Sequence, residues 1–245
     1  LQLVNREREP AAREALEKLQ AMGARRLRGE PITRILGEKE FYGLTFKVNA
    51  GTLIPRPETE MLVLKALQIL ESRGGKRRIL DLGTGTGCIA ISILTEAPTA
   101  TAVATDINSE AVMAAQANAE THGVARRLDV RLGSWFEPLE PGDKFDVIVS
   151  NPPYIPHAVI ETLAPEVKDH DPREALDGGP DGLEAYRAIV AEARRWLKSQ
   201  GVLIVEIGSE QMVAVKSLFL QAGFRDVVFE KDLAGLDRML VGYHS

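Results

Sequence analysis

Cysteine is nearly absent from this 245-residue chain, in which Cys88 is the only one. A single cysteine cannot form an internal disulfide, and the first residues do not read as a secretory signal, so we expect the protein to work in the reducing cytosol. No apolar run approaches the ~20 residues that a membrane-spanning helix requires. Aromatic residues make up only 5%, but 44% hydrophobic and 27% charged residues are typical of a globular protein. This composition excludes a disordered, collagen-like or coiled-coil chain.

An excess of positive charge is also lacking. The chain has 30 lysine and arginine residues against 35 aspartate and glutamate residues, a net charge of −5. Proteins that bind nucleic acid through its phosphates usually carry a basic surface, so the negative net charge argues against purely electrostatic binding of DNA or RNA. The length suits one large α/β domain, or a domain of about 200 residues with a small appendage.

The first third of the chain predicts a helix, a hairpin and a second helix. Residues 10–27 place apolar side chains at the three-and-four spacing of an amphipathic helix, which we interpret as a packing helix. Residues 40–41 and 44–48 flank Tyr42-Gly43, which predicts two short strands joined by a tight turn. The segment LIPRPETE then opens a helix over 61–70, where Pro57 suits the first turn and Glu58 and Glu60 favour its positive end.

The rest of the chain alternates strands with helices. Apolar runs such as VIVS and VLIVEI are typical of strands covered on both faces. This pattern predicts an α/β fold with a doubly wound parallel sheet, whose ligand lies beyond the carboxyl ends of the strands. The expected strands are 78–81, 101–106, 130–132, 145–150, 202–207, 227–230 and 239–243, and the expected helices are 88–96, 109–122, 182–197 and 211–222; a proline-rich loop follows residue 150.

A glycine-rich turn follows the first of these strands. The residues of this turn are Gly83, Thr84, Gly85, Thr86 and Gly87. Glycines at a strand-to-helix turn let a ligand approach the backbone, and the helix start offers N–H groups to an anion. The G-x-G-x-G spacing is neither the dinucleotide fingerprint nor a phosphate-binding loop, which would need a Lys-Ser/Thr pair. We predict that this turn binds a nucleoside cofactor.

Asp106 ends the next strand. An acidic residue there can accept both hydroxyls of a ribose, and Ile107 beside it would cover an adenine. The alternative is that Asp106 caps the following helix. S-adenosylmethionine fits these parts because it has a ribose, an adenine and a carboxylate but no phosphate. The arrangement resembles class I S-adenosylmethionine-dependent methyltransferases. That resemblance implies a Rossmann-like sheet of seven strands with the last antiparallel, a role that residues 238–243 would fill.

The sequence NPPY, Asn151-Pro152-Pro153-Tyr154, directly follows the strand FDVIVS. In methyltransferases this motif marks enzymes that methylate a nitrogen conjugated to a planar group. The Asn151 side-chain oxygen and the Pro152 carbonyl can each accept one N–H of the target amide, and Tyr154 can pack against its plane. Catalysis is then mainly positioning, with proline holding the loop rigid. No metal-binding set and no Ser-His-Asp set competes with this interpretation, so we expect no metal.

The chain as a whole, from about Arg26 to Tyr243, resembles the HemK/PrmC family of peptide-chain release factor glutamine N5-methyltransferases. The matching stretches are RRLRGEPITRILGEKEFYGLTFKV, LIPRPETE, DLGTGTGCIAISI, SWFEPL, FDVIVSNPPYIP, LAPEV, DPREALDGGPDGLEAYRAIV and VEIGSEQ. The resemblance implies methylation of the glutamine in the Gly-Gly-Gln motif of class I release factors. It also implies that the glycine turn and Asp106 bind the cofactor, and that Asn151 contacts both cofactor and substrate.

The resemblance adds further residues. Trp135 would line the adenine pocket, although a core tryptophan is an equal alternative. Gly178-Gly179 would form a tight turn beside the active site. The motif that holds Arg56, Glu58 and Thr59 would lie near the methionine end of the cofactor, or would simply start a helix.

The resemblance also divides the chain. We expect a partial N-terminal helical module over 1–36, a β-hairpin linker over 37–54 and the catalytic domain over 55–245. Family members begin with a longer helical module that grips the release factor, whereas only residues 1–27 precede RGEPI here. We therefore expect most of that module to be missing, which weakens partner binding and spares the cofactor. A monomer without direct contacts to nucleic acid or membrane is expected.

Three other functions remain open. A sister enzyme methylates a glutamine of a ribosomal protein and shares NPPY, but it usually lacks the PRPETE form of residues 55–60. A DNA methyltransferase acting on the adenine amine would need a basic face and usually a target-recognition domain. The last alternative, from a different class, is a cofactor-binding module without activity, which the intact Asn151 and Pro152 disfavour.

Overall fold

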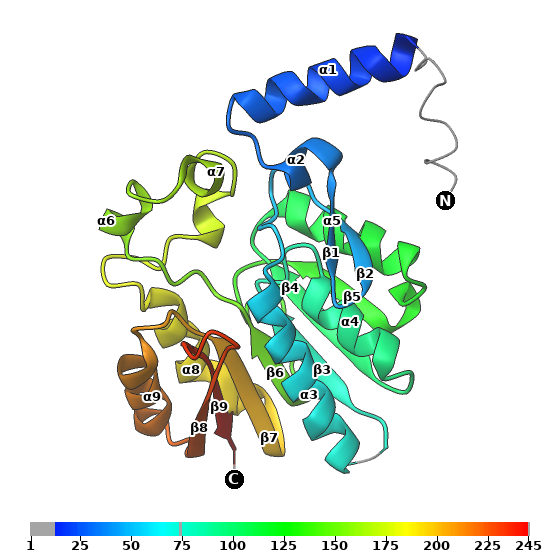
Figure 1. Cartoon of the computed structure of the whole chain (residues 1–245). Coiled ribbons are helices and arrows are strands. Elements are labelled where there is room, and N and C mark those ends of the chain that lie inside the picture. Colours follow the sequence, from blue (N-terminus) through cyan, green and yellow to red (C-terminus); the bar gives the residue numbers. More distant parts are fainter. Residues whose placement is uncertain (1–12, 74, 245) are drawn as a thin grey trace.

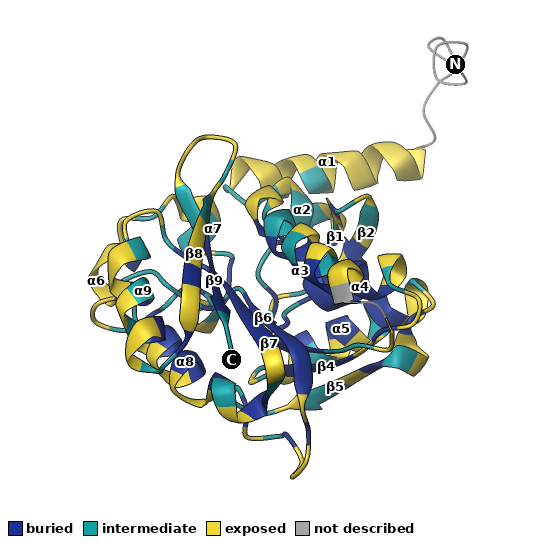
Figure 2. Ribbon diagram, turned by 90° about the horizontal axis from the view of Figure 1, so that it is seen from below, coloured by how far each residue is buried: buried dark blue, intermediate teal, exposed yellow. Residues whose placement is uncertain are grey.

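The computed structural model describes residues 13–73 and 75–244, so residues 10–12 of the expected first helix lie outside the described residues. Helix α1, Arg13–Leu27, projects from the body of the molecule (Figure 1). None of its residues is buried, and Leu19 is 66% exposed. The expected packing helix is therefore present, but its apolar stripe is not covered by the described part of the chain, as the exposed colouring in Figure 2 shows.

The short elements that follow, within residues 32–47, form a small unit beside the main sheet. A five-residue helix that sequence periodicity had not indicated, α2, covers Ile32–Leu36. Strands β1, Glu38–Phe41, and β2, Leu44–Lys47, pair antiparallel and confirm the expected hairpin. Tyr42 and Gly43 have φ of 52° and 72°, the left-handed values of the two-residue turn that suits strand twist. The turn is local, but Phe41 and Phe46 are buried in the hydrophobic core of the main domain and anchor the hairpin there.

Seven strands form the main sheet, with β5-β4-β3-β6-β7-β9-β8 as their order. The last strand, β9, runs antiparallel to both of its neighbours, which confirms the expected methyltransferase topology. The strands are β3 (Arg78–Leu82), β4 (Thr101–Asp106), β5 (Leu128–Leu132), β6 (Phe145–Ser150), β7 (Leu197–Glu206), β8 (Arg225–Lys231) and β9 (Asp237–Tyr243). The helices between and before them are α3 (Glu60–Arg73), α4 (Cys88–Glu96), α5 (Ser109–Thr121), α8 (Glu184–Trp196) and α9 (Met212–Gln221).

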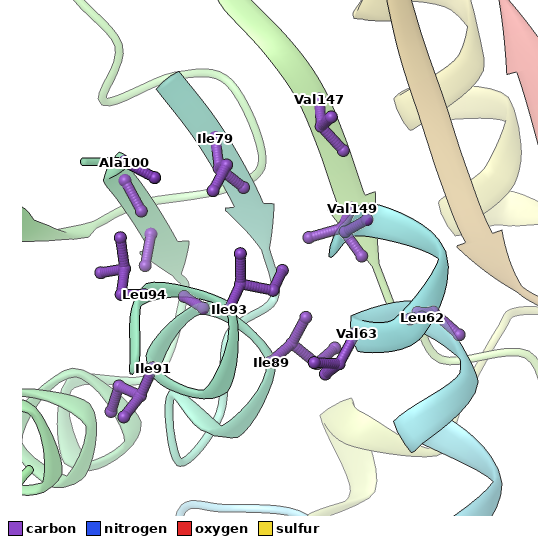
Figure 3. Close-up of a cluster of buried hydrophobic side chains, with 14 of the residues drawn as sticks. Leu62, Val63, Ile79, Ile89, Ile91, Ile93, Leu94, Ala100, Val147 and Val149 are labelled. Carbon is purple, nitrogen blue, oxygen red and sulfur yellow. The ribbon is translucent and has the colours of Figure 1, made fainter. Parts of the chain in front are cut away.

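Two hydrophobic layers sandwich this sheet because alternate strand residues point to opposite faces. On β3, Ile79 packs with α3 and α4, whereas Leu80 packs with α8 and α9. Figure 3 shows the first layer, where Val63 of α3 and Ile89 of α4 lie beside the strands that carry Ile79 and Val149. No helix within the described residues combines the length and the apolar character that crossing a bilayer requires.

The strand register brings four chain segments to one edge of the sheet. Leu82 of β3 pairs with Thr105 of β4 and with Ser150 of β6, and Ser150 also pairs with Val205 of β7. The residues that follow these positions are the glycine turn, Asp106, the NPPY segment and Glu206. Parallel strands thus place all four at their carboxyl ends, where open α/β sheets bind ligands.

The proline-rich segment after β6 is partly helical. It holds α6 (His157–Ile160), α7 (Pro165–Lys168) and a 3-10 turn, η4 (Arg173–Ala175). Its two ends meet at Ile155, whose N–H donates to the Leu176 carbonyl at 3.0 Å and whose carbonyl accepts the Gly178 N–H at 2.9 Å. The segment therefore folds back onto the residues that follow NPPY.

Candidate active site

The glycine turn between β3 and α4 is held by its neighbour strand. Gly83, Gly85 and Gly87 all have positive φ, which other residues adopt only with strain. The N–H groups of Gly83 and Thr84 donate to the Thr105 carbonyl at 2.9 and 3.0 Å. These bonds turn the backbone sharply at the end of β3, and the loop then passes directly into α4.

Asp81 lies beneath this turn and was assigned no role from the sequence. Its carboxylate is fully buried and accepts hydrogen bonds from Thr84 Oγ1 at 2.7 Å and from the Ala90 N–H at 3.3 Å. Burial raises the pKa of Asp81 to about 7. An acidic residue in an otherwise apolar strand, just before the glycines, is the sequence signal that marks it. Asp81 joins the glycine turn to the first turn of α4.

Asp106 lies at the end of β4 and faces the glycine turn. Its carboxylate accepts the Gly85 N–H at 2.8 Å and the Asn108 N–H at 2.9 Å, and burial raises its pKa. Helix α5 is capped by Asn108, whose side-chain oxygen accepts the N–H groups of Glu110 and Ala111. The alternative role of Asp106 as the helix cap is therefore wrong.

A cavity of about 310 Å³ opens above these residues. Most of the residues expected to bind the cofactor line it, namely Gly83, Thr84, Gly85, Thr86, Asp106, Ile107, Trp135 and Asn151. Gly87 is not among its lining residues. A side chain at Gly87 would meet Ile91 at 2.8 Å and the Ala115 backbone at 3.3 Å, so this glycine allows close helix packing.

The cavity has the parts that a nucleoside cofactor needs. Asp106 offers carboxylate oxygens at one side, and Ile107, which is exposed, offers an apolar surface next to it. Cys88 and Ile89, the first residues of α4, line the cavity as well. The volume falls within the range of small-molecule sites. The residues present therefore fit S-adenosylmethionine, with the acidic group for a ribose and the helix start for a carboxylate.

Trp135 lies between the cavity and the hydrophobic layer, next to both of the places considered for it. The residue lines the cavity, and its ring lies 3.4 Å from the position that a Cβ on Gly83 would occupy. It also packs against the hydrophobic layer under α8 and α9. Its backbone has φ of 44° and its carbonyl accepts the Thr105 hydroxyl at 2.8 Å. The strained conformation, tied to β4, turns the ring toward the glycine loop.

A second cavity, of about 240 Å³, adjoins the first. Pro152 and Tyr154 line the second cavity, Pro153 lines the first, and Asn151 lines both. The other residues that the two cavities share are Leu53, Arg56 and Ala175. The NPPY segment thus stands at the junction of two compartments, one with cofactor-binding features and one lined by polar and apolar groups.

Tyr154 is held firmly in the second cavity. Its hydroxyl donates to Glu206 Oε1 at 3.5 Å, and its carbonyl accepts Gln211 Nε2 at 2.9 Å. Burial, with the nearby Glu206 carboxylate, raises the pKa of Tyr154 to about 12, so the phenol stays protonated. Glu206 and Gln211 belong to VEIGSEQ, which matched the family but received no role. Their signal is an acidic residue at the carboxyl end of the strand next to NPPY.

Arg56 also stands between the cavities, as part of a network with two other residues. One Arg56 N–H donates to Asp171 Oδ2 at 3.1 Å, and Arg34 donates to Asp171 Oδ1 at 2.7 Å. The side chains of Asp171 and Arg34 are both buried, so removing either one would leave the other as an uncompensated buried charge. The network connects α2, the PRPETE segment and the loop after NPPY around the junction.

The described parts of the chain, residues 13–73 and 75–244, bring together no three histidine, cysteine, aspartate or glutamate side chains placed to hold a metal ion.

The pair Gly178-Gly179 was expected to form a tight turn, and Gly179 has φ of 86°. Gly178 lies so close to the Tyr154 backbone that a Cβ would stand 2.9 Å from its carbonyl carbon. The DGGPDG segment is therefore packed directly against the NPPY segment.

Comparison with known proteins gives relatives over nearly the whole chain. The family model described as methyltransferase small domain matches residues 59–167. A release factor glutamine methyltransferase of Agrobacterium fabrum is 45% identical over 94% of this chain and 80% of its own length. Proteins of the same name from Geobacter sulfurreducens and Gloeobacter violaceus are 44% and 41% identical, over 95% and 96% of this chain and 80% and 82% of their own lengths.

Solved structures share the fold at much lower identity. A methyltransferase from Pyrococcus furiosus aligns with a TM-score of 0.60 at 21% identity and covers 90% of this chain and 96% of its own. An O-methyltransferase family protein from Burkholderia thailandensis gives a TM-score of 0.53 at 16% identity, over 77% of this chain and 57% of its own. These likenesses concern the arrangement of sheet and helices.

Proposed function

Because this chain belongs to the release factor glutamine methyltransferase family, we propose that it methylates the side-chain amide nitrogen of the glutamine in the Gly-Gly-Gln motif of class I release factors. S-adenosylmethionine is the methyl donor. The observation that carries this proposal is the position of Asn151 at the junction of two adjoining cavities. A donor in the first cavity and an amide in the second would meet at this residue.

The residues of the first cavity bind and orient the donor. Asp106 accepts hydrogen bonds from the ribose, Ile107 and Trp135 cover the adenine, and the turn Gly83–Gly87 lets the cofactor approach the start of α4. When bound, the cofactor supplies an electrophilic methyl group on a sulfonium, which is an excellent leaving group. The protein therefore has to provide orientation rather than a strong base.

The NPPY segment prepares the acceptor. An amide nitrogen is a poor nucleophile because its lone pair is delocalised into the carbonyl. The Asn151 side-chain oxygen and the Pro152 carbonyl each accept one N–H of the glutamine, which enriches the nitrogen and turns it toward the methyl group. Tyr154 packs against the plane of the amide, and its protonated hydroxyl stays on Glu206. The nitrogen protons become acidic as the new bond forms, and one of them passes to solvent water, which leaves the neutral methylated amide.

The proposed organisation follows the expected division. Residues 1–36 belong to a helical module, residues 37–54 form a hairpin linker, and residues 55–245 form the catalytic domain. Within the described residues, Lys47 N–H of the linker donates to Asn118 Oδ1 of α5 at 2.9 Å, which fixes the hairpin to the catalytic domain. A release factor as substrate is consistent with a monomeric enzyme in the cytoplasm that makes no direct contact with nucleic acid or membrane.

A transfer assay tests the proposed substrate. The protein is incubated with methyl-labelled S-adenosylmethionine and, separately, with a class I release factor, a ribosomal protein and duplex DNA. We expect label on the release factor only, and none when the glutamine of its Gly-Gly-Gln motif is replaced by alanine. Label on DNA or on the ribosomal protein, without label on the release factor, would contradict the proposal.

Replacing Asp106 with alanine tests the proposed ribose contact. Loss of a charged hydrogen-bond acceptor should weaken S-adenosylmethionine binding by about 1.5–3 kcal/mol, roughly a 10- to 150-fold rise in Kd. Isothermal titration calorimetry measures this change. Asp129→Ala is the matched control, because Asp129 is an exposed carboxylate on the neighbouring β5 that pairs with Arg131. Equal affinities for the two variants would contradict the role of Asp106.

A further inference from the structure

The side chain of Asn151 is itself held by the buried Thr59, which in turn is held by the buried Glu206. Resting on the proposed function, we propose that Thr59 and Glu206 are positioning residues. Their hydrogen-bond chain has a single direction, and that direction determines which end of the Asn151 amide faces the glutamine of the substrate.

This hydrogen-bond chain consists of two consecutive bonds. Asn151 Nδ2 donates to Thr59 Oγ1 at 3.1 Å, and the Thr59 hydroxyl donates to Glu206 Oε2 at 2.6 Å. Thr59 and Glu206 are each only 2% exposed. Water therefore has little access to either group, and each has to satisfy its hydrogen-bonding capacity within the protein.

The direction follows from the chemistry of each group. A carboxylate can only accept, so the single hydroxyl hydrogen of Thr59 is committed to Glu206. Thr59 can then only accept from Asn151, and the one donor that the Asn151 side chain has is its NH₂ group. This leaves Asn151 Oδ1 as the end available to the second cavity. An oxygen is the atom needed there, because the target amide brings N–H groups.

Tertiary structure creates this chain from three distant segments. Glu206 is the last residue of β7, and the strand register pairs its neighbour Val205 with Ser150, which precedes Asn151. Thr59 closes a short 3-10 turn, η2 (Pro57–Thr59), just before α3. The buried carboxylate is thus placed beside the reacting edge of the sheet rather than at a helix end or on the surface.

The same arrangement makes the direction of these hydrogen bonds sensitive to pH. Burial raises the pKa of Glu206 to about 7, and the Thr59 hydrogen bond and the positive charge of Arg238 limit the rise. A protonated Glu206 can donate to Thr59. The Thr59 hydroxyl is then free to donate to Asn151 Oδ1, which turns the NH₂ group toward the substrate and opposes its N–H groups.

Other groups around Glu206 have to be considered in any pH profile. They are Arg238 of β9, Glu58 of η2, Arg56 at the junction, Tyr154 after β6 and Tyr186 of α8, whose hydroxyl donates to the Glu206 backbone carbonyl. The raised pKa values of both tyrosines keep them protonated near neutral pH. Glu206 is therefore the group in this cluster whose raised pKa lies near neutrality. Asp81 beneath the glycine turn also has a pKa raised to about 7, so the pH profile of Asp81→Asn has to be recorded beside that of Glu206→Gln.

Three variants of the full chain test the proposal in the release factor assay. Thr59→Val keeps the shape of the side chain and removes the hydroxyl, and we expect kcat to fall roughly 10- to 100-fold, with smaller changes in KM and in cofactor affinity. Thr59→Ser restores the hydroxyl and should recover most of the lost kcat. Thermal unfolding and cofactor titration of each variant distinguish loss of orientation from loss of the fold.

The pH dependence of kcat in Glu206→Gln is the measurement that a merely structural role of Glu206 would leave unchanged. In the unchanged protein, kcat should fall as the pH decreases through about 7, because Glu206 acts as the carboxylate. Glutamine can both donate and accept, so this variant should have a lower kcat at alkaline pH and no decline in that window. A Thr59→Val variant with unchanged kcat, or a Glu206→Gln variant that keeps the decline, would overturn the proposal.

The outcomes separate this inference from the proposed function. If the unchanged protein does not methylate the release factor at all, the proposed function is wrong. If it does methylate the release factor, and Thr59→Val and Glu206→Gln behave like the unchanged protein over the whole pH range, the function stands and the positioning role is wrong.

Discussion

Replacing Asn151 with alanine should remove most of the methyl transfer and leave S-adenosylmethionine affinity nearly unchanged. The alanine side chain offers no oxygen to the glutamine N–H, and the amide loses one of the two bonds that orient it. By analogy with the loss of a preorganised polar partner at other active sites, the barrier should rise by about 2–4 kcal/mol, which lowers kcat roughly 30- to 900-fold. Single-turnover transfer to a release factor measures this effect.

Two further variants sharpen this experiment. Asn151→Asp keeps the shape and the oxygens, but it cannot donate to Thr59 and it brings a second negative charge toward Glu206, so it should not restore the rate. Gln221→Ala is the control, because it removes an amide from the exposed end of α9, where its partner is Ser217. Normal methylation by Asn151→Ala would show that the NPPY amide does not hold the substrate.

Replacing Gly182 with alanine should reduce both stability and activity. Gly182 has φ of 74°, a conformation that costs another residue about 1–2 kcal/mol. A Cβ there would also stand 2.5 Å from the Tyr154 carbonyl oxygen and 2.7 Å from Gln211 Nε2. Both atoms belong to the hydrogen bond that holds the NPPY segment, so the methyl group has to displace it. A small displacement of this segment should lower kcat roughly 10- to 100-fold.

Gly142→Ala provides the matched control. Gly142 has φ of 96° and no atom within 4 Å of its ideal Cβ, so this substitution adds conformational strain without a steric clash. Denaturant unfolding should show a larger loss of stability for Gly182→Ala than for Gly142→Ala, and only the former should change kcat. If the two variants matched each other in both measurements, the packing of Gly182 against Tyr154 would have no functional importance.

Much of the fold was predictable because its signals are local. The hairpin depends on a two-residue turn in which Gly43 adopts positive φ without strain, and most of the seven strands contain short apolar runs. The helix over 88–96 and the strands over 101–106 and 145–150 have the bounds that periodicity predicts. The five-residue helix α2 lacks enough turns for an apolar period, and the strand β7 starts at Leu197, immediately after α8, where no turn residue marks the change.

The structure differs from the sequence predictions mainly in the tertiary contacts between elements. The stripe of α1 has the correct helical spacing, but spacing does not say whether another element covers it, and the described structure leaves it exposed. Gly87 belongs to the glycine motif, but it packs against Ala115 of α5 instead of lining the cavity. Of the two roles weighed for Asp106, the structure excludes the helix cap, because Asn108, two residues later, caps α5.

The sequence by itself determined the class of chemistry, because motifs such as the glycine turn and NPPY are contiguous and their roles follow from residue type and position on a strand. Only the tertiary structure decided how Asn151 is oriented. Thr59 lies 92 positions before Asn151 and 147 positions before Glu206, and the three residues meet through strand register and a short turn. Hydrogen-bond direction depends on which atoms are in contact, and this information exists only after folding.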